Sequence, residues 1–215
     1  TAAILFLLVL VICFLGGYPK RYLSLIVFLG IFTLSIFVLV IKSYPELMPN
    51  RVDTWTSRVD NFINSDNTES NYQIEKDKIA IATGGIKGLG PGKSIQKNFL
   101  PQSSSDFIYA IIIEEFGLIG GLFLVILYLW FLFRIVIISN KSESVFGSLL
   151  AVSMGLPIVF QAFINMSVAV ELMPVTGQTL PLISKGGTSI IFTCIAIGII
   201  LSISRNTNDR DYEKA

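Results

Sequence analysis

The chain has 215 residues, of which 53% are hydrophobic and only 14% are charged. Since an average soluble domain carries about 25% charged residues, a soluble globule of this composition would expose much of its apolar surface to water. The formal net charge of +1 gives no global field for binding nucleic acid, and the absence of His excludes His-based acid–base chemistry and the commonest zinc sites. The two cysteines, Cys13 and Cys194, lie inside apolar runs and are expected to be core residues rather than a disulfide.

The charged residues are concentrated in one internal stretch. Residues 42–106 hold 16 of them, whereas residues 1–41 hold two and residues 107–204 hold seven. This distribution predicts an all-α polytopic membrane protein with one long polar loop and a polar tail.

Five apolar stretches are candidates for transmembrane helices, because a bilayer core of about 30 Å needs about 20 apolar helical residues. In chain order they are 2–16, 22–41, 107–138, 145–170 and 188–203. The first is short, but it follows a Thr and lacks a basic segment or a cleavage motif, so a signal peptide is not expected. We expect it to be a span within a longer parent protein, of which this chain is the C-terminal part.

The predicted organisation follows from these spans. It comprises two transmembrane helices in 1–41, a loop over 42–105, three transmembrane helices in 106–204 with a Pro/Gly-rich turn at 171–187, and a tail over 205–215.

Basic residues in the short connections predict the orientation. One predicted face carries Lys20, Arg21, Arg134, Lys141, Arg205, Arg210 and Lys214. The other short connection has only Lys185, and long loops cross the membrane largely regardless of their charge. The tail is therefore expected in the cytoplasm, with the 42–105 loop and the 171–187 turn outside.

The second half of the long loop contains a candidate anion site. Residues 72–82 are expected to form a short interfacial helix, followed by a Gly-rich stretch at 84–93 with Lys87, Lys93 and Lys97 in or near it. Glycine N–H groups and lysines suit phosphate groups, but the spacing is not that of a P-loop and no strand precedes it. A solvated flexible loop is the alternative interpretation.

Asp106 stands where the loop enters the third predicted span, after three serines. One interpretation is structural, because Ser and Asp accept hydrogen bonds from the free N–H groups at a helix N-terminus. The other is functional: a carboxylate at the outer membrane surface could take a proton or bind a divalent cation.

Glu114 and Glu115 form an acidic pair inside the same predicted span, about 12 Å of helix rise below Asp106. Carboxylates at membrane depth are costly, so at least one should face a polar cavity or another helix rather than lipid. They are candidate cavity carboxylates, with a purely structural role as the alternative.

Taken in order, these segments resemble the FtsW/RodA/SpoVE family, the shape, elongation, division and sporulation proteins. The resemblance rests on Tyr72-Gln73, Gly84-Gly85, Gly88-Leu89-Gly90, Gln96-Lys97, Leu100-Pro101, Ser105-Asp106-Phe107, Glu114-Glu115-Phe116-Gly117, Gln161 through Asn165 (QAFIN) and residues 173–189 (MPVTGQTLPLISKGGTS). It covers nearly the whole chain, is most similar to the cell-division branch, and places the chain as the last five of about ten family spans. Gln102 stands where many members have Glu, which argues against an acid–base role at that position.

The resemblance implies a peptidoglycan glycosyltransferase that polymerises lipid II into glycan strands during septal wall synthesis. It implies Asp106 as the catalytic residue, acting as a base or as a ligand of a divalent cation such as Mg²⁺ or Mn²⁺, with no organic cofactor. Candidate contacts to the pyrophosphate or sugar are Lys93, Gln96, Lys97, Thr176, Ser184 and Lys185. A lipid II flippase and a non-catalytic scaffold that recruits the division transpeptidase are the alternatives.

The resemblance also implies a location and partners. These are the bacterial cytoplasmic membrane at the division septum, a class B penicillin-binding protein, other divisome membrane proteins and membrane lipid, but no nucleic acid. Small residues allow close helix approach, so a partner helix is expected on the face formed by Gly117, Gly120, Gly121, Gly147 and Gly155.

Overall fold

The computed structural model describes residues 2–43, 70–96 and 106–213, and every regular element in these ranges is a helix. Within these ranges, four helices are long and apolar enough to cross a membrane: Lys20–Phe37, Ile108–Lys141, Val145–Ala169 and Gly187–Arg205. The first predicted span is a shorter apolar helix, with its apolar part at Leu5–Leu15. The predicted all-α polytopic membrane fold is confirmed for the described part of the chain.

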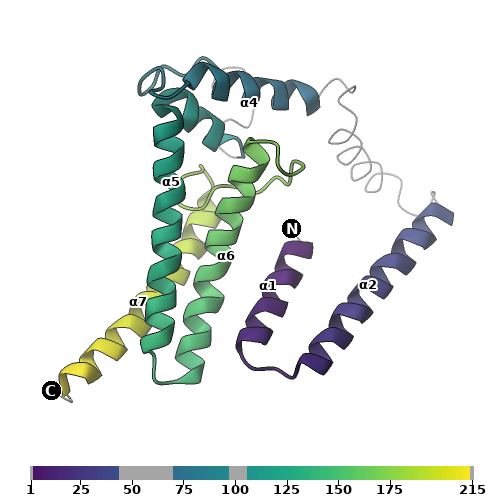
Figure 1. The fold of residues 1–215 in the computed structure, drawn as a ribbon, viewed down its shortest axis with the longest axis vertical. Helices are drawn as coiled ribbons and strands as arrows, with labels where there is room; N and C mark the ends of the chain where they lie inside the picture. Colours follow the sequence, from purple (N-terminus) through teal and green to yellow (C-terminus); the bar gives the residue numbers. More distant parts are fainter. Residues whose placement is uncertain (1, 44–69, 97–105, 214–215) are drawn as a thin grey trace. The chain divides into compact units, whose positions relative to one another are not determined.

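The chain divides into two compact units, and the first, Ala2–Asn67, contains a helical hairpin. Helix α1 (Ala2–Leu15) and helix α2 (Lys20–Ser43) are joined by a tight turn (Figure 1). Gly17 adopts a φ of 76° in this turn, a left-handed conformation that glycine reaches without steric cost.

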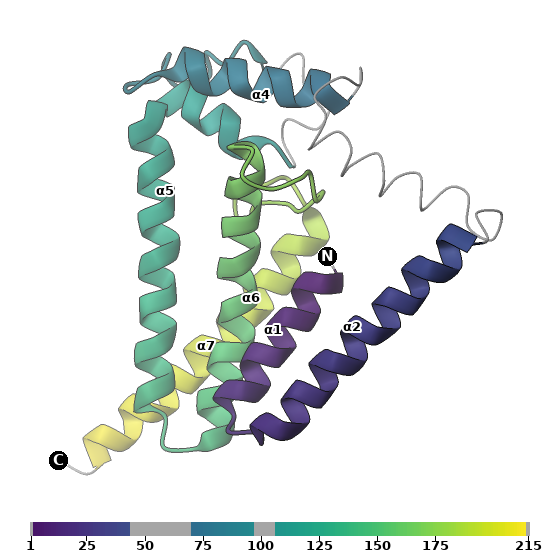
Figure 2. The ribbon, with the colours of Figure 1, turned by 45° about the vertical axis from the view of Figure 1, so that its right-hand side comes forward.

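The second unit carries the candidate site residues and contains four helices. They are α4 (Ser70–Gly84), α5 (Ile108–Lys141), α6 (Val145–Ala169) and α7 (Gly187–Glu213). In Figures 1 and 2, α5 and α6 run side by side, α7 crosses them at an angle, and α4 lies across one end of the unit. Helix α4 confirms the short helix predicted at 72–82.

Two apolar clusters hold this unit together. The cluster nearer α4 contains Tyr109, Ile113, Tyr128, Ala162, Met166, Ala169 and Leu180. The other contains Ile135, Ile138, Ala151, Val159 and Ile200, and joins α5, α6 and α7. The first cluster includes a residue of the α6–α7 connection, so this connection is packed into the fold rather than lying loose over it.

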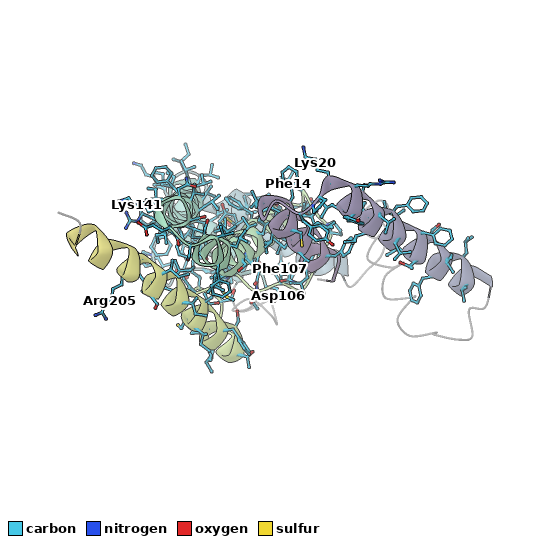
Figure 3. The ribbon with its side chains drawn as sticks, turned by 90° about the horizontal axis from the view of Figure 1, so that it is seen from below. Phe14, Lys20, Asp106, Phe107, Lys141 and Arg205 are labelled. Atoms are coloured by element: carbon cyan, nitrogen blue, oxygen red, sulfur yellow. The ribbon has the colours of Figure 1, made fainter. Side chains whose placement is uncertain are left out.

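The end of the unit opposite α4 carries the basic connection and the C-terminal helix. The α5–α6 connection, beginning near Lys141, lies there together with the C-terminal end of α7 (Figure 1), and Arg205 projects from α7 away from the other helices (Figure 3). Both basic segments lie at one end, as the orientation prediction requires. Helix α7 continues to Glu213, so most of the expected tail is helical. Cys194 is exposed on this helix rather than buried as predicted.

The predicted glycine docking face is wrong. Four of its five glycines are buried inside the unit: Gly117, Gly121, Gly147 and Gly155. A Cβ added at Gly155 would lie 2.2 Å from the Ile135 side chain, and one at Gly121 would lie 2.9 Å from the Ile113 side chain. These glycines therefore serve packing within the chain, and they are not available to a partner helix.

Candidate functional site

Helix α5 is not one straight helix. It is interrupted at Gly117, whose φ of 71° and ψ of −173° are not helical, and a short first arm meets the long arm at an angle (Figures 1 and 2). The segment after α4 fills this break. The Leu118 N–H donates to the Gly85 carbonyl at 2.9 Å, and the Leu89 N–H donates to the Glu114 carbonyl at 2.9 Å. The Gly-rich segment and the first arm of α5 are thus joined through their backbones.

Glycine is required where these two backbones meet. A Cβ at Gly84 would lie 2.1 Å from the Ile113 carbonyl oxygen, and one at Gly88 would lie 2.2 Å from the Glu115 carbonyl oxygen. The N–H groups of Leu89 and Gly90 bond to α5 carbonyls, so these two are not presented to a phosphate group. Residues 84–90 are thus bonded to α5 rather than forming a flexible loop without fixed contacts, and the phosphate interpretation of the Gly-rich stretch stays a prediction.

Glu114 is buried inside this junction, and its side chain has 0% exposure. Its carboxylate accepts hydrogen bonds from the Ser94 hydroxyl, from the Ile95 N–H at 3.1 Å and from the Gln96 N–H at 3.4 Å. The prediction that Glu114 lines a cavity is therefore wrong, whereas the expectation that the pair would not both face lipid is confirmed. Glu115 is half-buried.

The rise of about 12 Å from Asp106 to Glu114 runs along the first arm of α5, which ends at Gly117, and not along the long arm. The acidic pair belongs to a short arm that packs against the segment after α4.

Asp106 lies two residues before α5 and is half-buried. The N-cap position is taken by Phe107, which is 2% exposed, so Asp106 is one residue short of the cap that the structural interpretation gave it. Its carboxylate lies beside Gly177: a Cβ there would be 3.7 Å from Oδ2. Gly177 has a φ of 67°, and the chain passes the carboxylate with no side chain at this point.

The buried amide of Asn165 connects Asp106 to the α6–α7 connection. Asn165 is 2% exposed, and its Nδ2 donates to the Asp106 carbonyl at 2.7 Å and to the Gln178 carbonyl at 2.6 Å. One turn earlier on α6, the Gln161 amide donates to the Thr179 carbonyl at 3.0 Å. Two amides on α6 therefore hold the connection, and one of them also holds Asp106.

The rest of the α6–α7 connection is fixed from inside the unit. The Tyr128 hydroxyl donates to the Pro181 carbonyl, and the Leu180 N–H donates to Ser184 Oγ at 2.7 Å. Ser184 is 3% exposed and so supports the turn rather than presenting its hydroxyl to solvent. Lys185, the next residue, is exposed.

The remaining predicted site residues fall in different places. Thr176 precedes Gly177 in the α6–α7 connection, and its buried Oγ1 has no hydrogen-bond partner among the described residues. The Oε1 of Gln96 is also buried without a hydrogen-bond partner among the described residues. The Gln96 backbone N–H, however, bonds to Glu114 rather than to a residue near Asp106. Lys93 is exposed. Lys97 lies outside the described residues.

Sequence reasoning did not identify Asn165 as the residue that holds Asp106, nor Gln161 and Tyr128 as residues that support the α6–α7 connection. The signal for the first two was present, because two amides one turn apart inside an apolar span must find partners at membrane depth. Their partners are backbone carbonyls of a distant connection, which a single sequence does not reveal.

The chemistry available at Asp106 is that of a single carboxylate on a fixed backbone. It can accept a proton from a hydroxyl group or contribute one ligand to a cation. Within the described ranges, no three Asp, Glu or Cys side chains come together as a metal site.

Comparisons with known proteins show the family to which the chain belongs. The family FTSW_RODA_SPOVE, described as cell cycle protein, matches residues 1–209. The chain is 37% identical over 210 residues to a probable peptidoglycan glycosyltransferase FtsW of Thioalkalivibrio sulfidiphilus, covering 96% of this chain and 50% of that protein. It is 38% identical over 182 residues to stage V sporulation protein E of Bacillus subtilis, covering 83% and 48%.

A solved structure, described as showing structural coordination of polymerization and crosslinking by a peptidoglycan synthase complex, superposes with a TM-score of 0.67 at 26% identity. The match covers 96% of this chain and 55% of that one. The chain thus spans about half the length of the curated relatives it matches. The match over residues 1–209 shows that the chain belongs to the FtsW/RodA/SpoVE family of cell cycle proteins.

Proposed function

We propose that this chain forms part of a peptidoglycan glycosyltransferase that polymerises lipid II during septal wall synthesis. Relatives that are named probable peptidoglycan glycosyltransferase FtsW support the activity and the division branch. The observation that carries the proposal is the placement of Asp106: a half-buried carboxylate beside Gly177, with its backbone held by Asn165.

In the proposed reaction, the 4-hydroxyl of a GlcNAc unit attacks the anomeric carbon of a glycan carried on undecaprenyl pyrophosphate. Asp106 takes the proton of the attacking hydroxyl, the new glycosidic C–O bond forms, and the C–O bond to the pyrophosphate breaks. The leaving pyrophosphate keeps the electron pair of that bond. A carboxylate is suited to this work because it is ionised at neutral pH and accepts a proton as the nucleophile forms.

A divalent cation is compatible with the residues present. Mg²⁺ is commonly bound by one or two carboxylates together with substrate phosphates and water. Asp106 would be the protein ligand in such an arrangement, and the pyrophosphate would supply further oxygens. A bound cation would neutralise charge on the leaving group.

The proposal includes a place in the cell and partners. We propose that the protein acts at the division septum with a class B penicillin-binding protein and other divisome membrane proteins. The similar solved structure, which concerns a complex that both polymerises and crosslinks, supports a transpeptidase partner. The α4 end of the second unit would lie outside the cell and the Lys141 end in the cytoplasm, in line with the basic residues.

The test of the activity is glycan formation from lipid II by the full-length protein in complex with its transpeptidase, comparing wild type with Asp106→Asn. Wild-type protein should form glycan chains, and the variant should lose about 10²–10⁴-fold in turnover. A protein that moved lipid II across vesicles without forming glycan would be the flippase. Full division activity of Asp106→Asn in cells would instead support the scaffold.

Orientation is tested separately by cysteine labelling. Cys13 and Cys194 are first replaced by Ala, and single cysteines are then introduced at Leu172, which is exposed in the α6–α7 connection, and at Ser142 after α5. A membrane-impermeant maleimide should label intact cells at position 172 but not at position 142. The reverse pattern would overturn the proposed orientation.

A further inference from the structure

The amide of Asn165 makes two bonds whose partners are far apart in the sequence. Its Nδ2 reaches the carbonyl of Asp106, 59 positions away, and the carbonyl of Gln178, 13 positions away. At 2.7 and 2.6 Å both are short for N–H···O bonds, and the side chain is 2% exposed. Three separate segments therefore meet at one buried group.

The chemistry of the partners fixes the orientation of this amide. Both are carbonyl oxygens, which only accept hydrogen bonds, so only the NH₂ group can satisfy them. A flipped amide would place Oδ1 against two oxygens of the same partial charge. The two N–H groups of Asn165 are thus committed to holding Asp106 and Gln178 at a fixed separation.

Gln161 provides an internal comparison. It lies four residues earlier, about one helical turn, and therefore on the same side of α6. Its amide donates to the Thr179 carbonyl at 3.0 Å and so holds the same connection. Among the described residues, both of its hydrogen bonds go to Thr179 and neither goes to Asp106. The difference between the two amides is the bond to Asp106.

The carboxylate of Asp106 depends on this arrangement for its position. Phe107, the next residue, is 2% exposed and anchored in the interior, and Gly177, one residue before Gln178, lies against the carboxylate itself. The Asn165 amide therefore sets the distance between the backbone that carries the carboxylate and the backbone that passes it.

We propose that Asn165 is a positioning residue for the reaction, which holds the Asp106 carboxylate against the α6–α7 connection. This inference rests on the proposed function, because its kinetic consequence presumes that Asp106 acts on the substrate. Displacing a reacting group by about 1 Å can cost about 10²-fold in rate. Loss of the two Asn165 hydrogen bonds should therefore lower turnover, while substrate affinity changes little.

The test compares two shape-matched variants, Asn165→Leu and Gln161→Met, in the full-length protein bound to its transpeptidase. Glycan formation is measured over a series of lipid II concentrations, with the melting temperature in parallel. Asn165→Leu should lower kcat by about 10–100-fold and leave KM within about 3-fold. Gln161→Met should leave kcat within about 3-fold. A kcat for Asn165→Leu within 3-fold of wild type, or an equal loss in both variants, would overturn the proposal.

A second measurement does not depend on activity. Hydrogen–deuterium exchange at the start of α5, in a peptide covering 106–116, should become faster in Asn165→Leu and stay at the wild-type rate in Gln161→Met. If wild-type protein forms no glycan, the proposed function fails, and this exchange still decides whether Asn165 holds Asp106. Unchanged exchange in Asn165→Leu overturns the inference in either case. If that variant does not fold, Asn165→Ser is judged by the same criteria.

Discussion

Two carboxylates eight positions apart, Glu114 and Asp106, have opposite surroundings. Glu114 is fully buried and accepts bonds from a hydroxyl and two backbone N–H groups. Asp106 is half-buried, and its backbone is held through its carbonyl while its carboxylate lies beside a glycine. An acidic residue in an apolar helix is therefore not functional by its position alone. Full burial and three hydrogen-bond donors give Glu114 a role in the fold, and the half-buried Asp106 is the carboxylate that we propose for the reaction.

The largest expected effect separates the two carboxylates by activity. Asp106→Asn should lower lipid II polymerisation by about 10²–10⁴-fold at an unchanged melting temperature, because the charge is lost and the shape is kept. Glu114→Gln should keep activity within a few-fold per folded molecule, because its oxygens hold the 94–96 segment rather than substrate. Equal losses of activity in both variants would remove the distinction drawn here.

The next effect concerns the junction around Glu114. Gly88→Ala should destabilise the protein by about 4 kcal/mol, because its Cβ would lie 2.2 Å from the Glu115 carbonyl oxygen. Gly92→Ala is the matched control, since Gly92 has a nearly equal φ of 75° with nothing within 4 Å. The control should cost only the backbone strain, about 1–2 kcal/mol. The measurement is the melting temperature in detergent, and a similar loss in both variants would contradict the close backbone approach.

A smaller effect tests how Glu114 supports the segment at 94–96. Glu114→Leu should cost about 2–3 kcal/mol, because it removes the acceptor of the Ser94 hydroxyl and of the Ile95 and Gln96 N–H groups. Glu114→Gln should cost about 1 kcal/mol, since its carbonyl oxygen still accepts and the Ser94 hydroxyl can accept from its NH₂ group. Thermal unfolding of the purified complex measures both. A Leu variant as stable as the Gln variant would show that the bonds add nothing.

The smallest expected effect tests whether α4 is coupled to the α6–α7 connection that passes Asp106. Lys78 on α4 pairs with Glu171 of the α6–α7 connection at 3.1 Å, and the Lys78 side chain is 62% exposed. Exposed ion pairs contribute about 0.2–1 kcal/mol, so Lys78→Met should shift the melting temperature only slightly and less at high salt. Kinetic constants for glycan formation should not change. A clear drop in kcat would mean that α4 also positions the connection beside Asp106.

Several features were predictable from short windows of sequence. The apolar runs predicted α2, α5, α6 and α7, and the loop pattern predicted α4, because length and hydrophobicity decide which segments can be helical in a membrane. The break in α5 was not predicted. Gly117 lies within an apolar run, and it breaks the helix only because the segment after α4 approaches it there.

At the site too, some features were predictable from short stretches of sequence and others were set by packing. Asp106 was selected from its place at a span entrance and from the family resemblance, but the N-cap role expected on local grounds falls to Phe107. Lys93 and Lys185 were selected for their charge, and both are exposed. Thr176 precedes Gly177, and only the packing of the α6–α7 connection shows that Gly177 lies beside the Asp106 carboxylate.

The sequence by itself therefore determined the class of protein, the helices and the family, since these depend on local composition and on ordered motifs. Only the tertiary structure decided which polar residues meet. Asn165 reaches Asp106 across 59 positions, and Tyr128 reaches Pro181 across 53. Buried donors must find acceptors somewhere, but which acceptors they find is set by how α5, α6 and their connections pack, and no local pattern encodes that choice.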